Sequence, residues 1–542
     1  MPDAKEIIKR HQKALDKKEN WRALYEDAYE FCIPNRNLYD GAWEAGQPGQ
    51  KKTSRLFDST AVHSTQRFAA RIQSALFPPY RRWMRLEPGE VVPENMRESI
   101  QSTLDMYSDR FFTCLHNTSF DLAMGEFLLD LAVGTGVMLV QPSDDPVEVL
   151  RFETVPPYLV SFDEGPNATV QNVYRRMRLR PENILRTYPL ARLNHRLRRA
   201  LEDAPDEEVE LLEATMYDTK RADFTIYLVD PTERETIMQR QIDHSPWIIA
   251  RYSKVAGEIM GRGPILTALP SIRSLNKTME LLLKNASINV GGVYLAQDDG
   301  VLNPQTIDIK PGAIIAVARS GGPTGPSLTP LARAGDIQLS QIILNDLRME
   351  IKRILLDDTL PPDNMSARSA TEIAERMREL SVNMGSAFGR LVSEAMVPLV
   401  RQTFNVMASI GMVEVPIRVD GREVQVTPVA PLAKTQDMDD VRDVLNFVQV
   451  AEQLGADGAL VLDKEAIALF IAQKLGVPVS LLVPQQARDD MKAAALEAAE
   501  MAAQTPEGAA MVANTAAQGL GGGGGGGPAL VDPQAMQQLM AS

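Results

Sequence analysis

The sequence predicts an α+β fold made of several domains, and three observations carry this prediction. Two long amphipathic helical patterns stand in the middle of the chain, at about 263–289 and 336–356. The segment between them, Val293–Ala318, has the pattern of short strands and turns, and Ser320–Pro330 has that of a loop. Short strand patterns also alternate with helical ones before residue 260. With 542 residues, the chain is long enough for three or four domains.

The first long helix is predicted from an apolar stripe that follows Gly261–Pro264 and reaches about Asn289. Pro264 suits a first helical turn, because its missing N–H would be unpaired there anyway. Pro270 lies inside the pattern, so the alternative is a start near Ser271. The stripe consists of Ile265, Leu266, Leu269, Ile272, Leu275, Met279, Leu282, Leu283 and Ala286.

The second long helix follows from the same spacing, with Asp336 as its N-cap and Leu356 near its end. Its stripe consists of Ile337, Leu339, Ile342, Ile343, Leu347, Ile351, Ile354 and Leu355. Each helix would span roughly 30–38 Å. Periodicity alone fits equally well an ordinary αα pair in the core of one globular domain.

The first 260 residues read as helices followed by strands, which is typical of an α+β domain. Helices are predicted at 3–31, 56–77, 93–117, 121–133 and 181–201, the first ended by Pro34 and the second by Pro78–Pro79. Strands are predicted at 136–141, 148–152, 158–162, 170–178, 211–217, 224–230 and 247–252.

After the helix pair, Pro361–Pro362 and Asn364 predict a loop over 357–369. A long helix at 371–410 with a kink at Pro398 follows, and then a β-hairpin at 413–429 that turns at Asp420–Gly421. Three further helices are predicted at 437–454, 464–475 and 484–503, and a disordered Gly-rich tail at 504–542.

Composition bounds the function. The net charge is −14, and residues 434–542 hold six Lys and Arg against fourteen Asp and Glu. This is not the profile of a broad basic face that grips nucleic acid, although DNA could still slide through a channel. Cys32 and Cys114 make no disulfide framework, so we expect a reducing compartment. The N-terminus is charged, which predicts no signal peptide, and the lack of a long apolar run predicts no membrane span.

No segment has the residues of a catalytic or cofactor site, so we expect no enzyme activity, metal or cofactor. The five histidines lack metal-ligand spacing. Gly134–Gly136 lacks the Lys of a phosphate loop and reads as a helix-to-strand turn. Asp58–Thr60 reads as a helix cap. The acidic run Asp203–Glu213 reads as a solvated loop and strand edge.

Basic residues recur on one side of each long helix. Spacings of four and seven bring them to a common stripe, which could meet DNA phosphates transiently along a passage. The alternative is solvent-facing charge, or pairing with Glu280 and Glu350. The channel candidates are Arg273, Lys277, Lys284, Arg348, Lys352 and Arg353.

The order of several short motifs resembles a known family, the head-to-tail connector or portal proteins of short-tailed (podovirus-type) bacteriophages. The resemblance covers about residues 5–500 and rests on the sum of motifs that are individually weak. They are Trp21, Tyr25 and Pro34; Leu56–Thr60; Leu76–Pro78 followed by Trp83; Gly134–Gly136; Gly261–Pro264; and Arg368–Ile373.

The resemblance implies a portal-type subunit with an α/β wing, a two-helix stem, a small β-containing clip, a long kinked helix and a helical crown. By this resemblance the wing is 1–262 with 371–433, the stem helices are 263–289 and 336–356, the clip is 290–335, and the crown is 434–503. The tunnel loop is 357–370, with Asp357, Asp358, Pro361, Pro362, Asn364, Ser366 and Arg368.

The resemblance also implies partners and a location. Such subunits form a ring of about twelve copies at one capsid vertex of the virion, assembled in the host cytoplasm. Double-stranded DNA passes through the ring, which contacts terminase, tail adaptor or nozzle proteins, and major capsid and scaffold proteins. The alternative is a helix-rich scaffold or interaction protein of cellular origin that has no enzyme activity.

Overall fold

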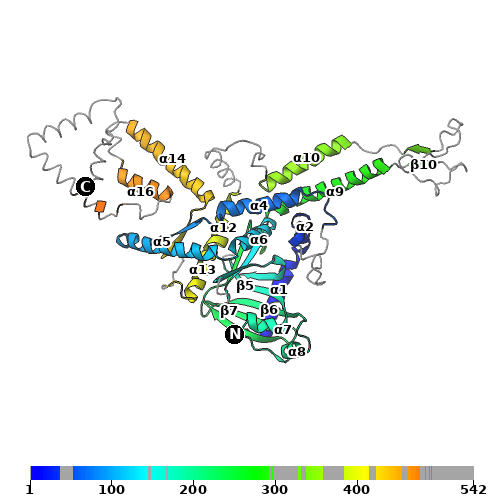
Figure 1. The fold of residues 1–542 in the computed structure, drawn as a ribbon, viewed down its shortest axis with the longest axis horizontal. Helices are drawn as coiled ribbons and strands as arrows, with labels where there is room; N and C mark the ends of the chain where they lie inside the picture. The colour runs from blue at the N-terminus through cyan, green and yellow to red at the C-terminus, as the bar shows by residue number, and fades with distance from the viewer. Residues whose placement is uncertain are drawn as a thin grey trace, which may run out of the picture. The chain divides into compact units, whose positions relative to one another are not determined.

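The computed structural model describes residues 2–36, 53–143, 148–166, 169–291, 294–296, 328–330, 337–357, 384–413, 423–453 and 462–475, with 483, 487–488, 490 and 493. The chain divides into two compact units, 1–433 and 434–542, which are described separately. Figure 1 shows the helices and strands of both.

The N-terminal segment forms two helices, α1 (Ala4–Glu19) and α2 (Arg22–Cys32), so the prediction of a single helix at 3–31 was wrong. The break at Asn20–Trp21 arises because the two halves pack on different partners. Ile7 of α1 belongs to a cluster on the five-stranded sheet, whereas Tyr25 of α2 belongs to the main core.

Three helices confirm the next predictions: α4 (Thr60–Leu76), α5 (Glu94–His116) and α6 (Phe120–Val133). The helix α4 starts later than the predicted Leu56, because the Asp58 carboxylate accepts the Thr60 backbone N–H at 2.8 Å. The aromatic rings of Phe77, Trp83, Phe111, Phe112 and Phe120 pack together beneath these helices, with centroids 5.1–6.4 Å apart.

The larger sheet is antiparallel, with the strand order β4-β5-β6-β7-β8. Its strands are β4 (Val160–Glu164), β5 (Val170–Leu179), β6 (Val209–Asp218), β7 (Asp223–Asp230) and β8 (Glu235–Ile242). The strand β8 was not predicted, because most of its side chains are polar and exposed, so its sequence lacks the alternation of apolar and polar residues that marks a strand. Residues of α1 pack on one face of the sheet, and those of α7 (Pro181–Thr187) and α8 (His195–Asp203) pack on the other.

Two predictions near this sheet were wrong. The helix at 181–201 is interrupted between α7 and α8, where the Arg192 backbone N–H instead bonds to the Ile237 carbonyl at 2.7 Å. The acidic run is solvated except at its end: the side chain of Glu213 lies inside the protein, and burial raises its pKa.

The smaller sheet has the order β3-β2-β9 and confirms three predicted strands. They are β2 (Thr135–Pro142), β3 (Leu150–Thr154) and β9 (Trp247–Arg251). Gly134 is the predicted helix-to-strand turn, between α6 and β2. A Cβ placed on it would lie 2.1 Å from the Gly261 carbonyl oxygen, so glycine is needed where these two backbones meet.

The two long helices form as predicted. The first, α9 (Pro264–Gly291), begins at Pro264 and contains Pro270, which decides between the two predicted starts. The second, α10 (Ile337–Ile354), lies beside it (Figure 1). Short strands β10 (Tyr294–Ala296) and β11 (Leu328–Pro330) pair with each other, so part of the predicted loop 320–330 is a strand.

The long kinked helix is described from Met384 onward. It consists of α12 (Ser386–Leu391), a π-helical turn (Val392–Met396) and α13 (Val397–Ser409). The π-helical turn precedes Pro398, whose ring cannot donate an N–H to an ordinary helical ladder.

The second strand of the predicted hairpin is present as β12 (Val424–Pro428), and it pairs with β1 (Met84–Pro88), a strand that was not predicted. The predicted turn at Asp420–Gly421 lies outside the described residues.

In the second unit, the described helices are α14 (Pro431–Gln453), which begins just before its boundary, and α16 (Lys464–Leu475). Lys474 of α16 bonds to Asp440 of α14 at 2.8 Å. The predicted helix at 484–503 and the tail at 504–542 lie almost wholly outside the described residues. Among the described helices, none has the length and hydropathy to cross a bilayer.

Candidate functional site

The pair α9–α10 is the candidate functional site, and buried apolar side chains fix its base. Ile272 and Leu275 of α9 belong to the main core, together with Leu344 and Ile351 of α10. Ile272, Leu275 and Ile351 belong to the predicted stripes, whose helical spacing places them on one face of each helix. Leu344 was not in the predicted stripe, and Leu283, Ile342 and Ile343 were wrongly placed on the buried face, because they are exposed. Deeper in the pair, Asn276 accepts the backbone N–H groups of Phe57 and Asp58 at 3.0 and 3.1 Å.

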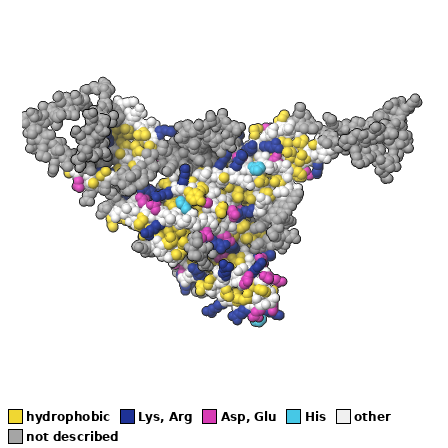
Figure 2. Space-filling model, viewed as in Figure 1, with side chains coloured by type: hydrophobic (Ala, Val, Ile, Leu, Met, Phe, Trp, Pro, Cys, Tyr) yellow, Lys and Arg dark blue, Asp and Glu magenta, His cyan; other side chains and the backbone are white. Residues whose placement is uncertain are grey.

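Apolar side chains also point away from the pair. They are Leu281 and Leu283 of α9, and Ile342, Ile343 and Met349 of α10, each 45–60% exposed. Figure 2 shows hydrophobic side chains gathered over this region. Single exposed apolar residues are ordinary, but a group along two neighbouring helices marks a contact surface.

The basic residues of α9 have carboxylate partners on the same chain. Arg273 pairs with Asp27 of α2. Lys277 and Lys284 both bond to Glu280, at 3.0 and 2.6 Å. The side chains of all three cations remain more than half exposed, so water and salt screen the pairs. Of the alternatives predicted for these basic residues, pairing with Glu280 is confirmed for Lys277 and Lys284, and both side chains also stay exposed to solvent.

On α10, Arg348 is an anchor. Its Nη2 and Nε atoms donate to Asp58 Oδ2 at 2.7 and 3.0 Å, and the Asp58 side chain is 4% exposed. Burial raises the pKa of Asp58, but hydrogen bonds from Thr60 and Arg348 outweigh burial and leave it below the ordinary value. The neighbouring Lys352 and Arg353 are both exposed.

The end of α10 is held by a second buried carboxylate. Asp357 accepts the Ser64 hydroxyl at 2.9 Å and lies 3.3 and 3.4 Å from the guanidinium groups of Arg67 and Arg71. All three partners belong to α4. Asp357 is the first residue of the predicted tunnel loop, so the structure shows how that segment starts. The other predicted tunnel-loop residues lie outside the described range: Asp358, Pro361, Pro362, Asn364, Ser366 and Arg368.

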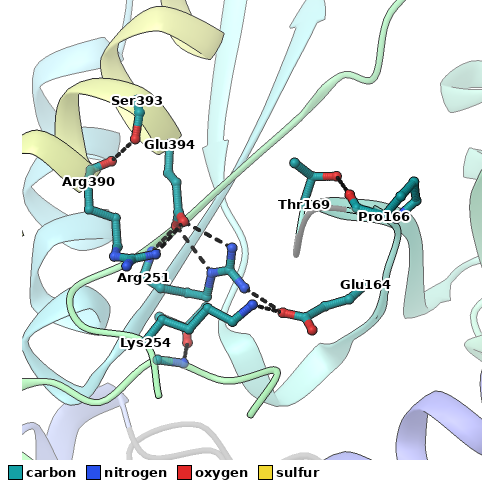
Figure 3. A network of polar contacts seen from close by, with 10 residues as sticks. Glu164, Pro166, Thr169, Arg251, Lys254, Arg390, Ser393 and Glu394 are labelled. Atoms are coloured by element: carbon teal, nitrogen blue, oxygen red, sulfur yellow. Dashed lines mark hydrogen bonds and ion pairs between the residues drawn. The ribbon is translucent and has the colours of Figure 1, made fainter. Parts of the chain in front are cut away.

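A third anchor holds the helical segment that follows the predicted tunnel loop (Figure 3). Arg251 of β9 is 3% exposed and donates from Nη2 and Nε to Glu394, at 2.9 and 3.2 Å, and from Nη1 to Glu164 at 2.9 Å. Lys254 also pairs with Glu164, and Arg390 bonds to Glu394 at 3.0 Å. Sequence reasoning missed this cluster, because its members lie up to 230 positions apart and share no motif.

These anchors position the helices and contain no arrangement of a nucleophile and a base. Within the described residues, no three or more His, Cys, Asp or Glu side chains are grouped so as to hold a metal ion. What the α9–α10 pair offers is a rigid base, exposed cations on both helices, and an uncovered apolar surface.

Comparison with known proteins identifies the family. Residues 4–482 match the family described as bacteriophage head to tail connecting protein. A probable portal protein of Bordetella phage BPP-1 is 23% identical over 530 residues, which cover 92% of this chain and 93% of the relative. The portal protein of Enterobacteria phage T3 is 22% identical, over 89% of this chain and 87% of its own length.

A solved chain from the virion of a native gene transfer agent particle aligns over 81% of this chain and 98% of its own length. Its identity is 11% and the TM-score is 0.34, a similarity too low to support an argument. The family match over most of the sequence confirms the resemblance found from the motifs. The chain belongs to the bacteriophage head to tail connecting proteins.

Proposed function

We propose that the chain is the subunit of a phage portal, a ring at one capsid vertex through which double-stranded DNA is packaged, retained and ejected. The names of the similar proteins from phages BPP-1 and T3 support this assignment. The ring would contain about twelve copies and belong to the virion. Terminase would dock on it during packaging, tail adaptor proteins afterwards, and capsid and scaffold proteins around it.

The observation that carries the proposal is the uncovered apolar surface of the α9–α10 pair. Three clusters at its base fix the pair to one chain, namely Asp58–Arg348, the Asp357 cluster and the buried apolar stripe. The exposed Leu283, Ile342 and Met349 then have no cover within the described part of the chain. Burying such a side chain fully stabilises by about 1.5–3 kcal/mol. Neighbouring copies in a ring would supply that cover.

The same pair would line the channel as a stem. Four of the six predicted cations already bond to carboxylates, so we expect weak and salt-sensitive contacts with DNA phosphates. An acidic ring, at −14 for each chain, would otherwise repel DNA and favour sliding. The remaining assignments follow the family layout: 1–262 and 371–433 as wing, 290–335 as clip, 357–370 as tunnel loop, and 434–503 as crown.

The DNA contacts can be tested without disturbing the anchors. Lys277→Ala, Lys284→Ala and Lys352→Ala remove exposed cations, whereas Arg348 must stay because it holds Asp58. We expect the triple variant to assemble normally and to retain packaged DNA less well as salt rises. Unchanged packaging and retention would remove the DNA role of this stripe.

The assembly itself is tested by the mass and shape of the purified chain, from multi-angle light scattering and negative-stain images. We expect rings with a central hole, formed alone or after scaffold is added. Leu283→Glu with Ile342→Glu should lower the ring fraction strongly. The matched control is Val91→Glu with Leu122→Glu, two exposed apolar positions away from the helix pair. A wild-type chain that stays monomeric or dimeric with scaffold present would overturn the proposal.

A further inference from the structure

A large cavity in the first unit has no role in the proposed function. Its volume is about 1630 Å³, above the roughly 300–1000 Å³ of small-molecule pockets. The floor is the face of the five-stranded sheet that α7 and α8 leave bare, near the turn between β6 and β7. The walls come from the end of β2 and from α13. A site of this size suits a length of polypeptide.

The lining is positively charged on a chain that is acidic as a whole. Five arginines face three carboxyl groups, those of Glu213, Asp223 and Asp243. Arg186 and Arg240 are exposed and have no ion-pair partner in the described ranges, and the same holds for Arg151. The cavity is therefore suited to an acidic occupant.

The interior of the site holds polar atoms that lack hydrogen bonds. Within the described residues, Glu213 Oε2, Asp223 Oδ1, Gln402 Oε1 and Asn405 Nδ2 have no partner, and all four side chains line the cavity. Glu213 is 2% exposed and Gln402 is 9% exposed. A buried polar atom without a partner costs about 1–3 kcal/mol. Three of these cavity atoms are acceptors and one is a donor, so a peptide could bond to all of them, because its backbone carries both N–H and C=O groups.

An acidic segment that fits this description lies on the same subunit, at the other end of β6. Asp203, Asp206, Glu207 and Glu208 are all exposed. Glu207 and Glu208 have no ion-pair partner among the described residues, whereas Asp203 and Asp206 pair with Arg199 and Arg180 at 3.0 and 3.7 Å.

This segment cannot reach its own cavity. Val209 follows it directly and pairs with Leu179 of β5, and α8 holds its other side. The strand β6 runs from Val209 to Asp218, about 30 Å toward the turn that borders the cavity. One chain thus presents an acidic projection at one end of β6 and a cationic hollow that extends from the middle of β6 to its other end. This is the arrangement that a head-to-tail contact between identical copies needs.

We propose that the cavity of each subunit receives the acidic segment Asp203–Glu208 of the neighbouring copy in the ring. This inference rests on the proposed ring and names one of its subunit contacts. Glu207 and Glu208 would meet Arg186 and Arg240, and backbone groups of the segment would satisfy the polar atoms on α13. Charge-assisted bonds in a partly closed cavity are stronger than pairs on an open surface.

The test is a charge exchange in the full-length chain. Arg186→Glu with Arg240→Glu reverses the cavity, and Glu207→Arg with Glu208→Arg reverses the segment. Each double variant should raise the concentration for half-assembly about tenfold or more, and the quadruple variant should recover most of the loss. Asp16→Arg with Glu90→Arg is the control for the segment variant, since it makes the same charge change at exposed positions elsewhere in the unit. Unchanged thermal unfolding verifies that each variant is folded.

A direct binding measurement identifies the occupant. A labelled peptide with the sequence of residues 203–210 should bind the chain carrying Glu207→Arg and Glu208→Arg, whose cavities would be empty. It should not bind the chain carrying Arg186→Glu and Arg240→Glu, and 0.5 M salt should weaken it (about a threefold rise in ionic strength over physiological).

The outcomes separate this inference from the proposed function. Wild-type rings together with unaffected double variants would overturn the contact and leave the portal assignment standing. An effect of the cavity variant alone, with no effect of the segment variant, would overturn the named occupant in favour of another acidic partner. An equal effect of the control would reduce the result to net charge and also overturn the inference. A wild-type chain that forms no ring with scaffold would contradict both proposals.

Discussion

Removing one carboxylate from the Arg251 cluster should cost more than removing the arginine that makes most of its bonds. In Glu394→Ala, the guanidinium of Arg251 stays 3% exposed and loses the carboxylate that accepts its Nε and Nη2 bonds, while Glu164 is shared between Arg251 and Lys254. A buried guanidinium that has lost one of its carboxylate partners lowers the free energy of unfolding by about 3–5 kcal/mol. In Arg251→Met, each carboxylate keeps a cation of its own, Lys254 for Glu164 and Arg390 for Glu394. An apolar side chain of similar length fills the space, so we expect a loss of about 1 kcal/mol.

Hydrogen exchange followed by mass spectrometry measures both variants, because the cluster joins β9 to the π-helical turn Val392–Met396. Amides of these two elements should exchange by local opening, with a free energy that falls by the predicted amounts. Glu394→Gln is the conservative variant and should lie between the two. An Arg251→Met chain that opens as readily as Glu394→Ala would refute the reasoning, since bond number and not charge balance would then decide stability.

Three further outcomes are expected. Asp58→Asn should destabilise the base of α10 by about 1.5–3 kcal/mol, because it removes the negative charge that accepts two bonds from Arg348. Since the folded pKa of Asp58 is lowered, the wild-type advantage should hold at neutral pH and disappear as the pH falls through that pKa, measured by exchange of α10 amides. Gly134→Ala should cost about 3 kcal/mol or prevent folding, because of the 2.1 Å approach, whereas Gly389→Ala should gain about 0.5–1 kcal/mol in thermal unfolding, since no atom lies within 4 Å. Burial raises the pKa of Asp130 to about 7 despite the opposing pair with Arg36, so its contribution to stability should be present at low pH and lost as pH rises through about 7. Asp130→Asn should flatten that part of the denaturation profile.

Much of the helical architecture could be predicted, because amphipathic periodicity is a local signal. The two long helices were placed within a few residues, and the turn at Gly134 was identified from glycine and the change of period. The family resemblance followed from the order of weak motifs and was confirmed by the match over residues 4–482.

What could not be predicted depends on partners far away in the chain. The break at Asn20 exists because α1 and α2 pack on different surfaces, and no local residue announces it. Arg348 belonged to a plausible basic stripe, yet the residue that binds it, Asp58, lies 290 positions earlier. The burial of Glu213 likewise depends on the sheet around it, because in the sequence it only ends a run of acids whose members at 203–208 are exposed.

The pairing of β1 with β12 has a consequence for synthesis. Thr427 bonds to Glu87, 340 positions away, so the first unit contains α9, α10 and everything between them as an insertion. A nascent chain cannot close this unit until residues 423–430 have left the ribosome, and contacts of such long range form slowly. The uncovered apolar surface of α9–α10 would by then have emerged without its final support. We therefore expect a window during translation in which premature association between unfinished chains is a hazard, and in which chaperones have their greatest effect on yield.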